Sequence, residues 1–197
     1  MPQPRDVFDH AYYERFYADP STRVADTSDD QKLARFVISY LDYLGVCIDS
    51  VLDLGCGTGR WKAALQAVLP DTPYTGVEIS DAMCEKHGWF KGSVATWKGP
   101  RSDLVVCHGV LQYLSDADAK KAIKNLAHHA DKALYLEVVS KEDWAHNVDK
   151  QLTDGEINLR KASWYRRQLS EHFHSAGGGL FLPKHSPVVL YELERGL

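Results

Sequence analysis

Cysteine is scarce in this 197-residue chain, and none of its four cysteines forms a Cys-x-x-Cys pair. They stand singly at Cys47, Cys56, Cys84 and Cys107. This spacing excludes the disulfide framework of small secreted domains and the paired ligands of a structural zinc site. We therefore expect reduced, mostly buried thiols in a cytoplasmic protein.

Long apolar runs and an excess of positive charge are also missing. No apolar stretch approaches the ~20 residues of a membrane span, and residues 1–13 lack the apolar centre of a signal peptide. The formal net charge is −4 and the pI is about 6.1. This balance disfavours a membrane or a nucleic acid as the main partner. The length predicts one domain over residues 1–197, as a monomer or a homodimer.

What the chain does contain is a glycine corner at residues 51–60, Val-Leu-Asp-Leu-Gly-Cys-Gly-Thr-Gly-Arg. An apolar stretch is followed by three glycines at alternate positions, and a helical run begins at Trp61. Strand, glycine turn and helix in this order suit nucleotide-type ligands, because glycine lets the backbone turn sharply and approach a ligand. A dinucleotide fingerprint needs its third small residue at position 60. Arg60 stands there, so NAD is disfavoured.

Residues 53–59 of this corner resemble motif I of the class I S-adenosylmethionine (SAM)-dependent methyltransferases. Residues 74–78 and 103–114 are similar to that family's second strand and motif IV. The resemblance implies SAM as cofactor, S-adenosylhomocysteine (SAH) as product, and methyl transfer to a small molecule by direct in-line displacement. It also implies an α/β, Rossmann-like, doubly wound fold, with a mostly parallel seven-stranded sheet, a C-terminal antiparallel hairpin and helices on both faces.

Hydrophobic periodicity and turn residues predict the individual elements. A helix over 30–44 would begin with a Ser28–Gln31 capping box and end at Gly45. Further helices are expected over 61–69, 115–130 and 166–175. Strands are expected over 51–54, 74–78, 92–97, 103–108 and 133–139, followed by a hairpin of 180–182 and 187–191.

The cofactor site follows from the glycine corner and the next strand. Glu78 lies 23 residues after Gly55, close to the ~20 expected for a carboxylate that accepts both ribose hydroxyls. The resemblance places Ile79 and Met83 beside the adenine ring, although both could equally belong to the core. Where the family usually carries an aspartate, this chain has Ser93. The predicted cofactor residues are Tyr12, Tyr13, Asp53, Gly55, Cys56, Gly57, Gly59, Glu78, Ile79, Met83, Ser93, Val94 and His108.

Two strand ends are predicted to face the reacting methyl group. By its resemblance to motif IV, His108 lies near that methyl group, either as a general base or as a hydrogen-bonding and packing residue. Glu137 lies near the end of the fifth predicted strand, where open α/β sheets place ligands. Both are candidate catalytic residues.

The segments 1–29 and 140–165 are predicted to close the site. The first is rich in tyrosine and resembles a lid, with anchoring of a terminal helix as the alternative. The second lies where the family commonly builds its substrate pocket, and 150–167 carries five cations and two acids. His146 and Asp149 have helical spacing, but no third ligand is visible, so no metal is assigned. The predicted substrate residues are Tyr113, Trp144, His146, Trp164 and Tyr165.

Other functions stay open at this point. The Asn/Asp-Pro-Pro-Tyr signature of base and glutamine N-methyltransferases is absent, which disfavours those substrates. An RNA or protein methyltransferase could use the basic segment 150–167. A non-catalytic SAM-binding module would keep the fold and the cofactor while transferring no methyl group.

Overall fold

The computed structural model describes residues 8–13 and 27–191, and its centre is a seven-stranded sheet of order β3-β2-β1-β4-β5-β7-β6. The first five strands in that order run parallel, and β7 is antiparallel to both β5 and β6. This confirms the predicted Rossmann-like sheet with its antiparallel C-terminal pair. The strands are β1 (Val51–Leu54), β2 (Tyr74–Glu78), β3 (Phe90–Lys91), β4 (Ser102–His108), β5 (Ala130–Glu137), β6 (Phe173–Gly177) and β7 (Leu180–Pro183).

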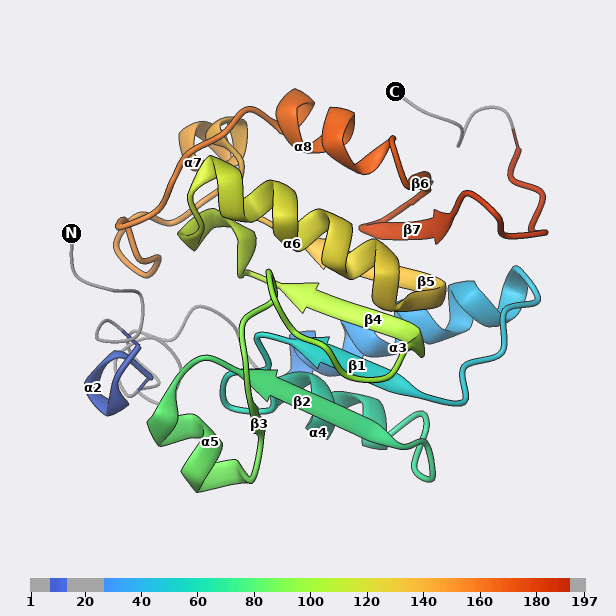
Figure 1. Ribbon diagram of the computed structural model, residues 1–197, viewed down its shortest axis with the longest axis horizontal. Coiled ribbons are helices and arrows are strands. Elements are labelled where there is room, and N and C mark those ends of the chain that lie inside the picture. Colours follow the sequence, from blue (N-terminus) through green and yellow to red (C-terminus); the bar gives the residue numbers. More distant parts are fainter. Residues whose placement is uncertain (1–7, 14–26, 192–197) are drawn as a thin grey trace.

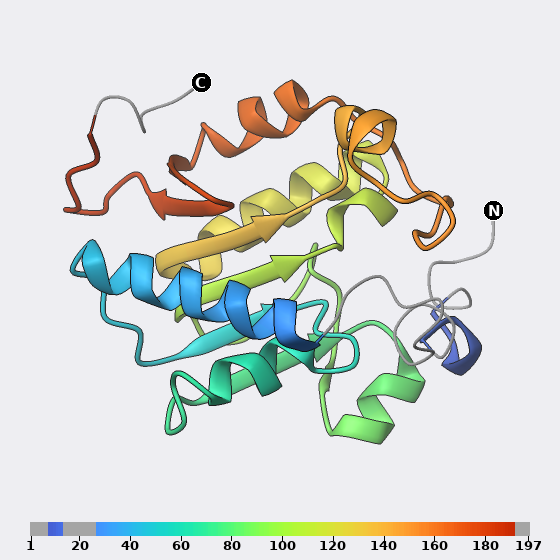
Figure 2. The ribbon, with the colours of Figure 1, turned by 180° about the vertical axis from the view of Figure 1, so that it is seen from behind.

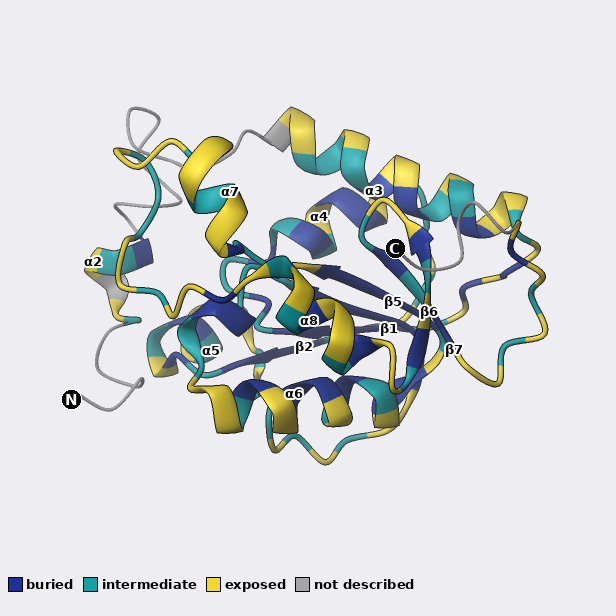
Figure 3. Cartoon of the chain, turned by 90° about the horizontal axis from the view of Figure 1, so that it is seen from above, coloured by how far each residue is buried: buried dark blue, intermediate teal, exposed yellow. Residues whose placement is uncertain are grey.

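Helices cover both faces of the sheet, because the central strands are apolar on both sides. Leu104 and Val106 of β4 pack towards one face, and Val105 and Cys107 pack towards the other. The first face is covered by α3 (Thr27–Tyr43) and α4 (Arg60–Gln66), which lie in front of the sheet in Figure 2. The opposite face carries α6 (Asp116–His129) and α8 (Ala162–Leu169) (Figure 3).

The remaining short helices lie towards the carboxyl ends of the parallel strands. In Figure 1, α2 (His10–Tyr13) and α7 (Lys141–His146) both lie beyond the arrowheads of β2 and β4, with α5 (Asp81–His87) close to α2. The 3-10 turn η2 (Leu111–Tyr113) follows β4 directly. Because these strand ends carry the glycine corner, the segments around them form the walls of one site.

Local signals placed some helix ends correctly. Ser115 caps α6 by accepting a hydrogen bond from the Asp118 backbone, as its spacing predicts. Gly45, at φ +75°, ends α3, and the Val46 backbone then donates back to the Leu41 carbonyl. The predicted capping box at Ser28 is wrong, because α3 already begins at Thr27 and Ser28 lies inside its first turn.

Three predicted elements are wrong. Residues 92–97 are not a strand, because β3 ends at Lys91 and the backbones of Thr96 and Trp97 fold back to donate to the Ser93 carbonyl. The helix predicted over 166–175 ends at Leu169, and residues 173–177 form β6. Gly178 and Gly179, both at positive φ, make the hairpin turn into β7, so the hairpin exists but uses 173–177 rather than 187–191.

Candidate functional site

A cavity of about 410 Å³ lies at the carboxyl ends of β1, β2, β4 and β5. This is the edge where open α/β sheets bind ligands. It collects segments that are far apart in the chain, from Phe8 to Asp154. Of the residues predicted from the sequence, its walls include Tyr12, Tyr13, Asp53, Gly55, Cys56, Gly57, Glu78, Ile79, Ser93, Val94, His108, Tyr113 and Glu137.

The glycine corner is shaped by close packing. Gly55 has φ +94°, and a Cβ added there would lie 2.3 Å from a methyl carbon of Val110. Gly57 has φ +49°, and a Cβ there would come within 3.3 Å of the Tyr13 ring. Both conformations favour glycine. The corner therefore holds its backbone against the cavity only while positions 55 and 57 lack side chains.

Trp89 supports the same corner from behind. Its indole nitrogen donates to the Gly57 carbonyl at 3.0 Å. A Cβ at Gly59 would lie 2.8 Å from the indole, and one at Gly76 would lie 2.6 Å from it. Gly59 does not line the cavity. The third glycine of the motif thus makes room for a tryptophan, and its predicted cofactor contact stays a prediction.

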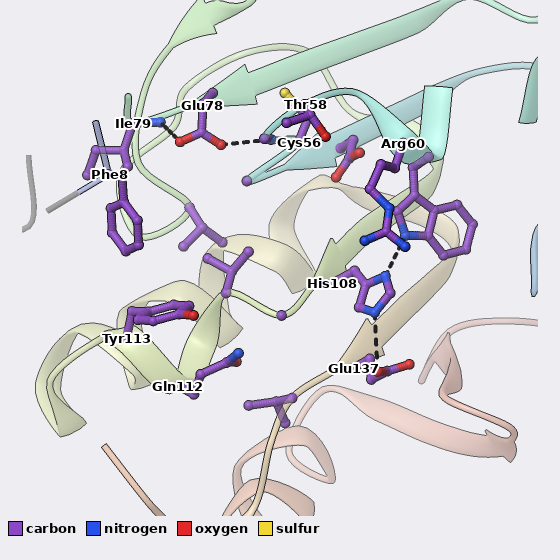
Figure 4. A pocket seen from close by; sticks show the side chains of 18 of the residues that line it. Phe8, Cys56, Thr58, Arg60, Glu78, Ile79, His108, Gln112, Tyr113 and Glu137 are labelled. Carbon is purple, nitrogen blue, oxygen red and sulfur yellow. Dashed lines mark hydrogen bonds and ion pairs between the residues drawn. The ribbon is translucent and has the colours of Figure 1, made fainter. Parts of the chain in front are cut away.

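Glu78 joins the glycine corner to the end of β2 and is only 3% exposed. Its Oε1 accepts a hydrogen bond from the Ile79 backbone at 2.7 Å, and its Oε2 accepts one from Gly57 at 2.9 Å (Figure 4). Oε1 also accepts a hydrogen bond from the Ser80 backbone at 3.0 Å. A carboxylate has about four acceptor positions. One position, on Oε2, is left for a ligand, so Glu78 can accept one hydroxyl without giving up a backbone bond.

Asp53 is the most deeply buried acid of the site, at 1% exposure. Burial raises its pKa to about 7, although the Tyr74 hydroxyl donates to Oδ2 and favours the charged form. Asp53 has no cationic side chain as hydrogen-bonding partner among the described residues. A buried carboxyl of this kind is suited to a positively charged ligand.

His108 and Glu137 are partners in the β4–β5 register, and they form a chain of hydrogen bonds with Trp61. The Trp61 indole nitrogen donates to His108 Nδ1 at 2.8 Å, and His108 Nε2 lies 3.2 Å from Glu137 Oε1 (Figure 4). An indole N–H can only donate. Nδ1 must therefore be unprotonated, the proton is on Nε2, and His108 donates it to Glu137.

This arrangement bears on the two roles predicted for His108. Both ring nitrogens are occupied, one by Trp61 and the other by Glu137. A general base needs a free lone pair within reach of the proton it accepts. In this structure His108 has none, so the geometry favours its hydrogen-bonding role. The bond from His108 also holds the pKa of Glu137 below its usual range.

A Trp61→Phe substitution tests this tautomer. We expect it to free Nδ1 and to shift His108 from the pure Nε2–H form to a mixture of both neutral tautomers, at a stability cost of about 1 kcal/mol for the lost hydrogen bond. Long-range ¹H–¹⁵N NMR of the histidine ring reads the tautomer directly. An Nδ1–H ring in the unsubstituted protein would contradict the assignment.

Residues 8–13 cover one side of the cavity. The hydroxyls of Tyr12 and Tyr113 lie 2.9 Å apart, and the Phe8 ring meets both tyrosine rings edge-on at about 5 Å. Ser80 Oγ donates to the Phe8 carbonyl at 2.6 Å. These contacts fit a lid in this part of the chain. The remainder of the predicted lid, 1–7 and 14–26, lies outside the described residues.

Five other predicted residues do not line the cavity. Met83 is buried at 1% exposure, within the core. Trp164 and Tyr165 pack on the Arg160 guanidinium. His146 is exposed, and the Trp144 ring lies beside Gly155 and Lys150. The residues of 140–165 that do reach the cavity are Thr153 and Asp154.

Sequence reasoning missed several wall residues: Leu33, Arg60, Trp61, Val110, Gln112, Thr153 and Asp154. Arg60 was noted only as a departure from the dinucleotide pattern, yet it forms a two-bonded ion pair with Asp30 at 2.6 and 2.5 Å. The sequence gives one indication of their role, because Arg60 and Trp61 are the first residues of the helix that follows the glycine corner. Their partners Asp30 and His108 lie 30 and 47 residues away, which no local spacing reveals.

Among the described residues, no three His, Cys, Asp or Glu side chains are grouped to hold a metal ion. Within the same part of the chain, no helix has the length and apolar character to cross a membrane.

Comparison with known proteins agrees with this geometry. Residues 52–132 match a family model described as a methyltransferase domain. The fold resembles that of magnesium protoporphyrin IX methyltransferase from Synechocystis PCC 6803, solved with bound SAH, at TM-score 0.66 and 21% identity over 91% of this chain and 95% of that one. A sugar N-methyltransferase from a Streptoalloteichus species gives TM-score 0.62 and 19% identity, over 97% and 94%. The fold is therefore that of these methyltransferases over most of the chain, and the match to the family model covers the glycine corner and the strands β2 to β4.

The curated relatives that match this chain also have the names of methyltransferases. The trans-aconitate 2-methyltransferase of Pseudomonas aeruginosa is 28% identical over 176 residues, which are 82% of this chain and 54% of the relative. The enzyme of that name from Methylobacterium radiotolerans is 36% identical over 73 residues, 33% of this chain and 28% of its own length. The chain thus spans about half, or less, of the curated relatives it matches.

Proposed function

We propose that the protein transfers a methyl group from SAM to a small-molecule acceptor. One observation carries this proposal: two buried carboxyl groups, Asp53 and Glu78, face one cavity at the ends of β1 and β2, on either side of a glycine corner held at positive φ. Residues 52–132, which include both of these acids, match a methyltransferase domain.

The residues present fit SAM. Glu78 Oε2 has one acceptor position for a ribose hydroxyl, and Ile79, Ser93 and Val94 form the adjoining wall for the adenine ring. Gly55 and Gly57 leave backbone beside Asp53 for the amino-acid end, which carries an ammonium group. Cys56, Tyr12 and Tyr13 complete this half of the cavity.

Bound SAM supplies a methyl group on a positively charged sulfur. The chain's own task is to hold the acceptor in line with it, and alignment alone can lower a barrier by about 7–11 kcal/mol. Residues 8–13 and Tyr113 reduce access of water to the cavity. His108 holds Glu137 in place, and Trp61 fixes the orientation of His108.

A small acceptor is favoured by the cavity and by the relatives. The cavity of about 410 Å³ lies within the size range of small-ligand sites. The relatives' names raise a carboxylate such as trans-aconitate as one candidate acceptor. We further propose a cytoplasmic enzyme, monomeric or homodimeric, that does not act on nucleic acid. Four free cysteines, two of them buried, support a reducing location.

Titration calorimetry with SAH, and with NAD as control, tests the cofactor. We expect micromolar binding of SAH alone. Binding of NAD alone, or of neither ligand, would contradict the proposal. Incubation of the protein with labelled SAM and extracts separated by size then distinguishes a small acceptor from RNA or protein. SAH binding without transfer to any fraction would support a non-catalytic module.

A Glu78→Ala substitution should weaken SAH binding by about 10- to 100-fold. It removes one charge-assisted hydrogen bond to the ligand, worth about 1.5–3 kcal/mol, and it also releases the Gly57 backbone. Glu85→Gln, an exposed acid on α5, is the control. Calorimetry that gives equal SAH affinity for the Glu78 variant and the unsubstituted protein would refute the role of Glu78.

A further inference from the structure

The described walls of the cavity carry six acids and one arginine. The acids are Asp29, Asp30, Asp53, Glu78, Glu137 and Asp154. Asp30 pairs with the arginine, Arg60, and Asp29 pairs with Lys32 at 2.9 Å. Asp53 and Glu78 belong to the proposed cofactor half. Glu137 and Asp154 are left in the other half, and neither has a lysine or arginine partner among the described residues.

The strand order separates these two halves. The glycine corner and Glu78 lie at the ends of the neighbouring strands β1 and β2, whereas β4 and β5 continue the sheet on the far side of β1. Glu137 ends β5, so it lies two strands away from the glycine corner. The space that it faces is therefore the space left for the acceptor.

The negative charge of Glu137 is stabilised by hydrogen bonds but is not paired with a positive charge. Its carboxylate accepts hydrogen bonds from His108 and from the Tyr135 hydroxyl at 2.8 Å. Both donors are uncharged, because the Trp61 bond leaves His108 as the neutral Nε2–H form. The side chain is 57% exposed, so one edge of the carboxylate still faces open space.

A second acceptor in the same region has no partner. The carboxamide oxygen of Gln112 is buried without a hydrogen bond to any described residue, and the whole residue is 5% exposed. Gln112 lines the cavity and lies on the same side of it as Glu137 in the view of Figure 4. This oxygen is itself shut off from the cavity, so it meets a ligand there only after the amide group rotates about its last bond.

We propose that the methyl acceptor is an amine that enters as an ammonium ion, with Glu137 as its counter-ion and the Gln112 oxygen, once its amide group has rotated, as a second hydrogen-bond acceptor. This inference rests on the proposed SAM-dependent function and adds the class of acceptor. A polycarboxylate is disfavoured, since it would place anions beside Glu137 and Asp154 with no free cation among the described wall residues.

The reaction balances as follows. The ammonium loses one proton to solvent along the exposed edge of Glu137. The lone pair of the resulting neutral amine forms the new nitrogen–carbon bond while the carbon–sulfur bond breaks. Its electron pair remains on sulfur, so SAH leaves as a neutral thioether, and the positive charge passes to the methylated ammonium.

Binding of sinefungin tests the charge of the acceptor space before any acceptor is known. This SAH analogue carries an amine where SAM carries its methylated sulfur, and SAH carries no charge there. We expect the unsubstituted protein to bind sinefungin about tenfold or more tightly than SAH. Glu137→Gln keeps an oxygen for the His108 bond and should remove most of that preference while leaving SAH affinity within about twofold. Glu171→Gln, an exposed acid after α8, is the control and should keep the preference.

Methyl transfer to matched acceptors is the second arm. SAH formation is measured with phenethylamine against 3-phenylpropionate, with glucosamine against glucuronate, and with trans-aconitate. Turnover of the amines alone supports the inference. Turnover of a carboxylate, or a sinefungin preference that is absent or survives in Glu137→Gln, overturns the amine while SAH binding still upholds the cofactor. If no probe turns over, the sinefungin comparison decides, and failure of SAH and sinefungin to bind removes the proposed function itself.

Discussion

Replacing Arg160 by methionine should lower the free energy of unfolding by about 3 kcal/mol. Arg160 is 6% exposed, and its guanidinium donates to the carbonyls of Leu111 and Leu114, to the Tyr165 hydroxyl and to Asp116. Methionine fills a similar volume but leaves these buried acceptors without a donor, at about 1–3 kcal/mol for each group that water cannot reach. Urea denaturation followed by circular dichroism measures the loss.

The matched control is Arg167→Met, which removes the same side chain from an exposed position of α8. We expect that change to stay within about 0.5 kcal/mol. Equal stabilities of the two variants would show that Arg160 does not hold the segment after α7 against η2. Arg160→Lys should recover little, because an ammonium group cannot reach acceptors spread over η2, α6 and α8 as the planar guanidinium does.

The protein should lose stability as the pH rises from 4 to 8, and Asp53 should account for much of the loss. The pKa of Asp53 is about 7 in the folded chain, against 3.8 as the ordinary value. Between these values the folded state keeps a proton that the unfolded state has released. The free energy of unfolding therefore falls as pH rises through this window and levels off above about 7, by on the order of 4 kcal/mol in total.

Asp53→Asn tests this source of pH dependence. Asparagine cannot titrate, so the variant should show a flatter profile and should exceed the unsubstituted protein in stability at pH 8. Asp71→Asn, an exposed acid between α4 and β2, is the control and should leave the profile unchanged. Denaturant titrations at pH 5, 6.5 and 8 measure both effects. Parallel profiles for the Asp53 variant and the unsubstituted protein would contradict the raised pKa.

The parts of the fold that could be predicted depend on local pattern. β1 and β4 are buried on both faces, and their sequences show it in the apolar run 104–107 of β4 and in the three apolar residues that surround Asp53 in β1. Ser115 and Gly45 mark helix ends through bonds within a few residues. The strand β6 could not be recognised, because its sequence Phe-His-Ser-Ala-Gly has little strand propensity beyond Phe173 and is held by pairing with β7.

The residues of the candidate site also fall into those that local sequence places and those that contacts between distant segments place. Residues next to the glycine corner reach the cavity because β1 and its turn carry them there, and Glu78 follows from the parallel pairing of β2 with β1. Trp164 and Tyr165, expected as substrate residues, do not line the cavity for a different reason. Arg160 draws Trp164 and Tyr165 to its own guanidinium, and its partners Leu111 and Asp116 lie 49 and 44 residues away. Contacts of that range are set by tertiary packing.

The indole of Trp89 has a consequence for how the glycine motif varies between sequences. It occupies the volume that a side chain at Gly59 or at Gly76 would need. A smaller residue at position 89 opens both spaces at once, although Gly59 also keeps a backbone conformation that other residues rarely adopt. Position 76, whose φ is not positive, can then take alanine if Cys56 Sγ, 2.9 Å from the added Cβ, also turns away. In an alignment of relatives, the side chains at positions 76 and 89 should therefore change size in opposite directions. These positions are 13 residues apart in sequence, but their side chains compete for the same space.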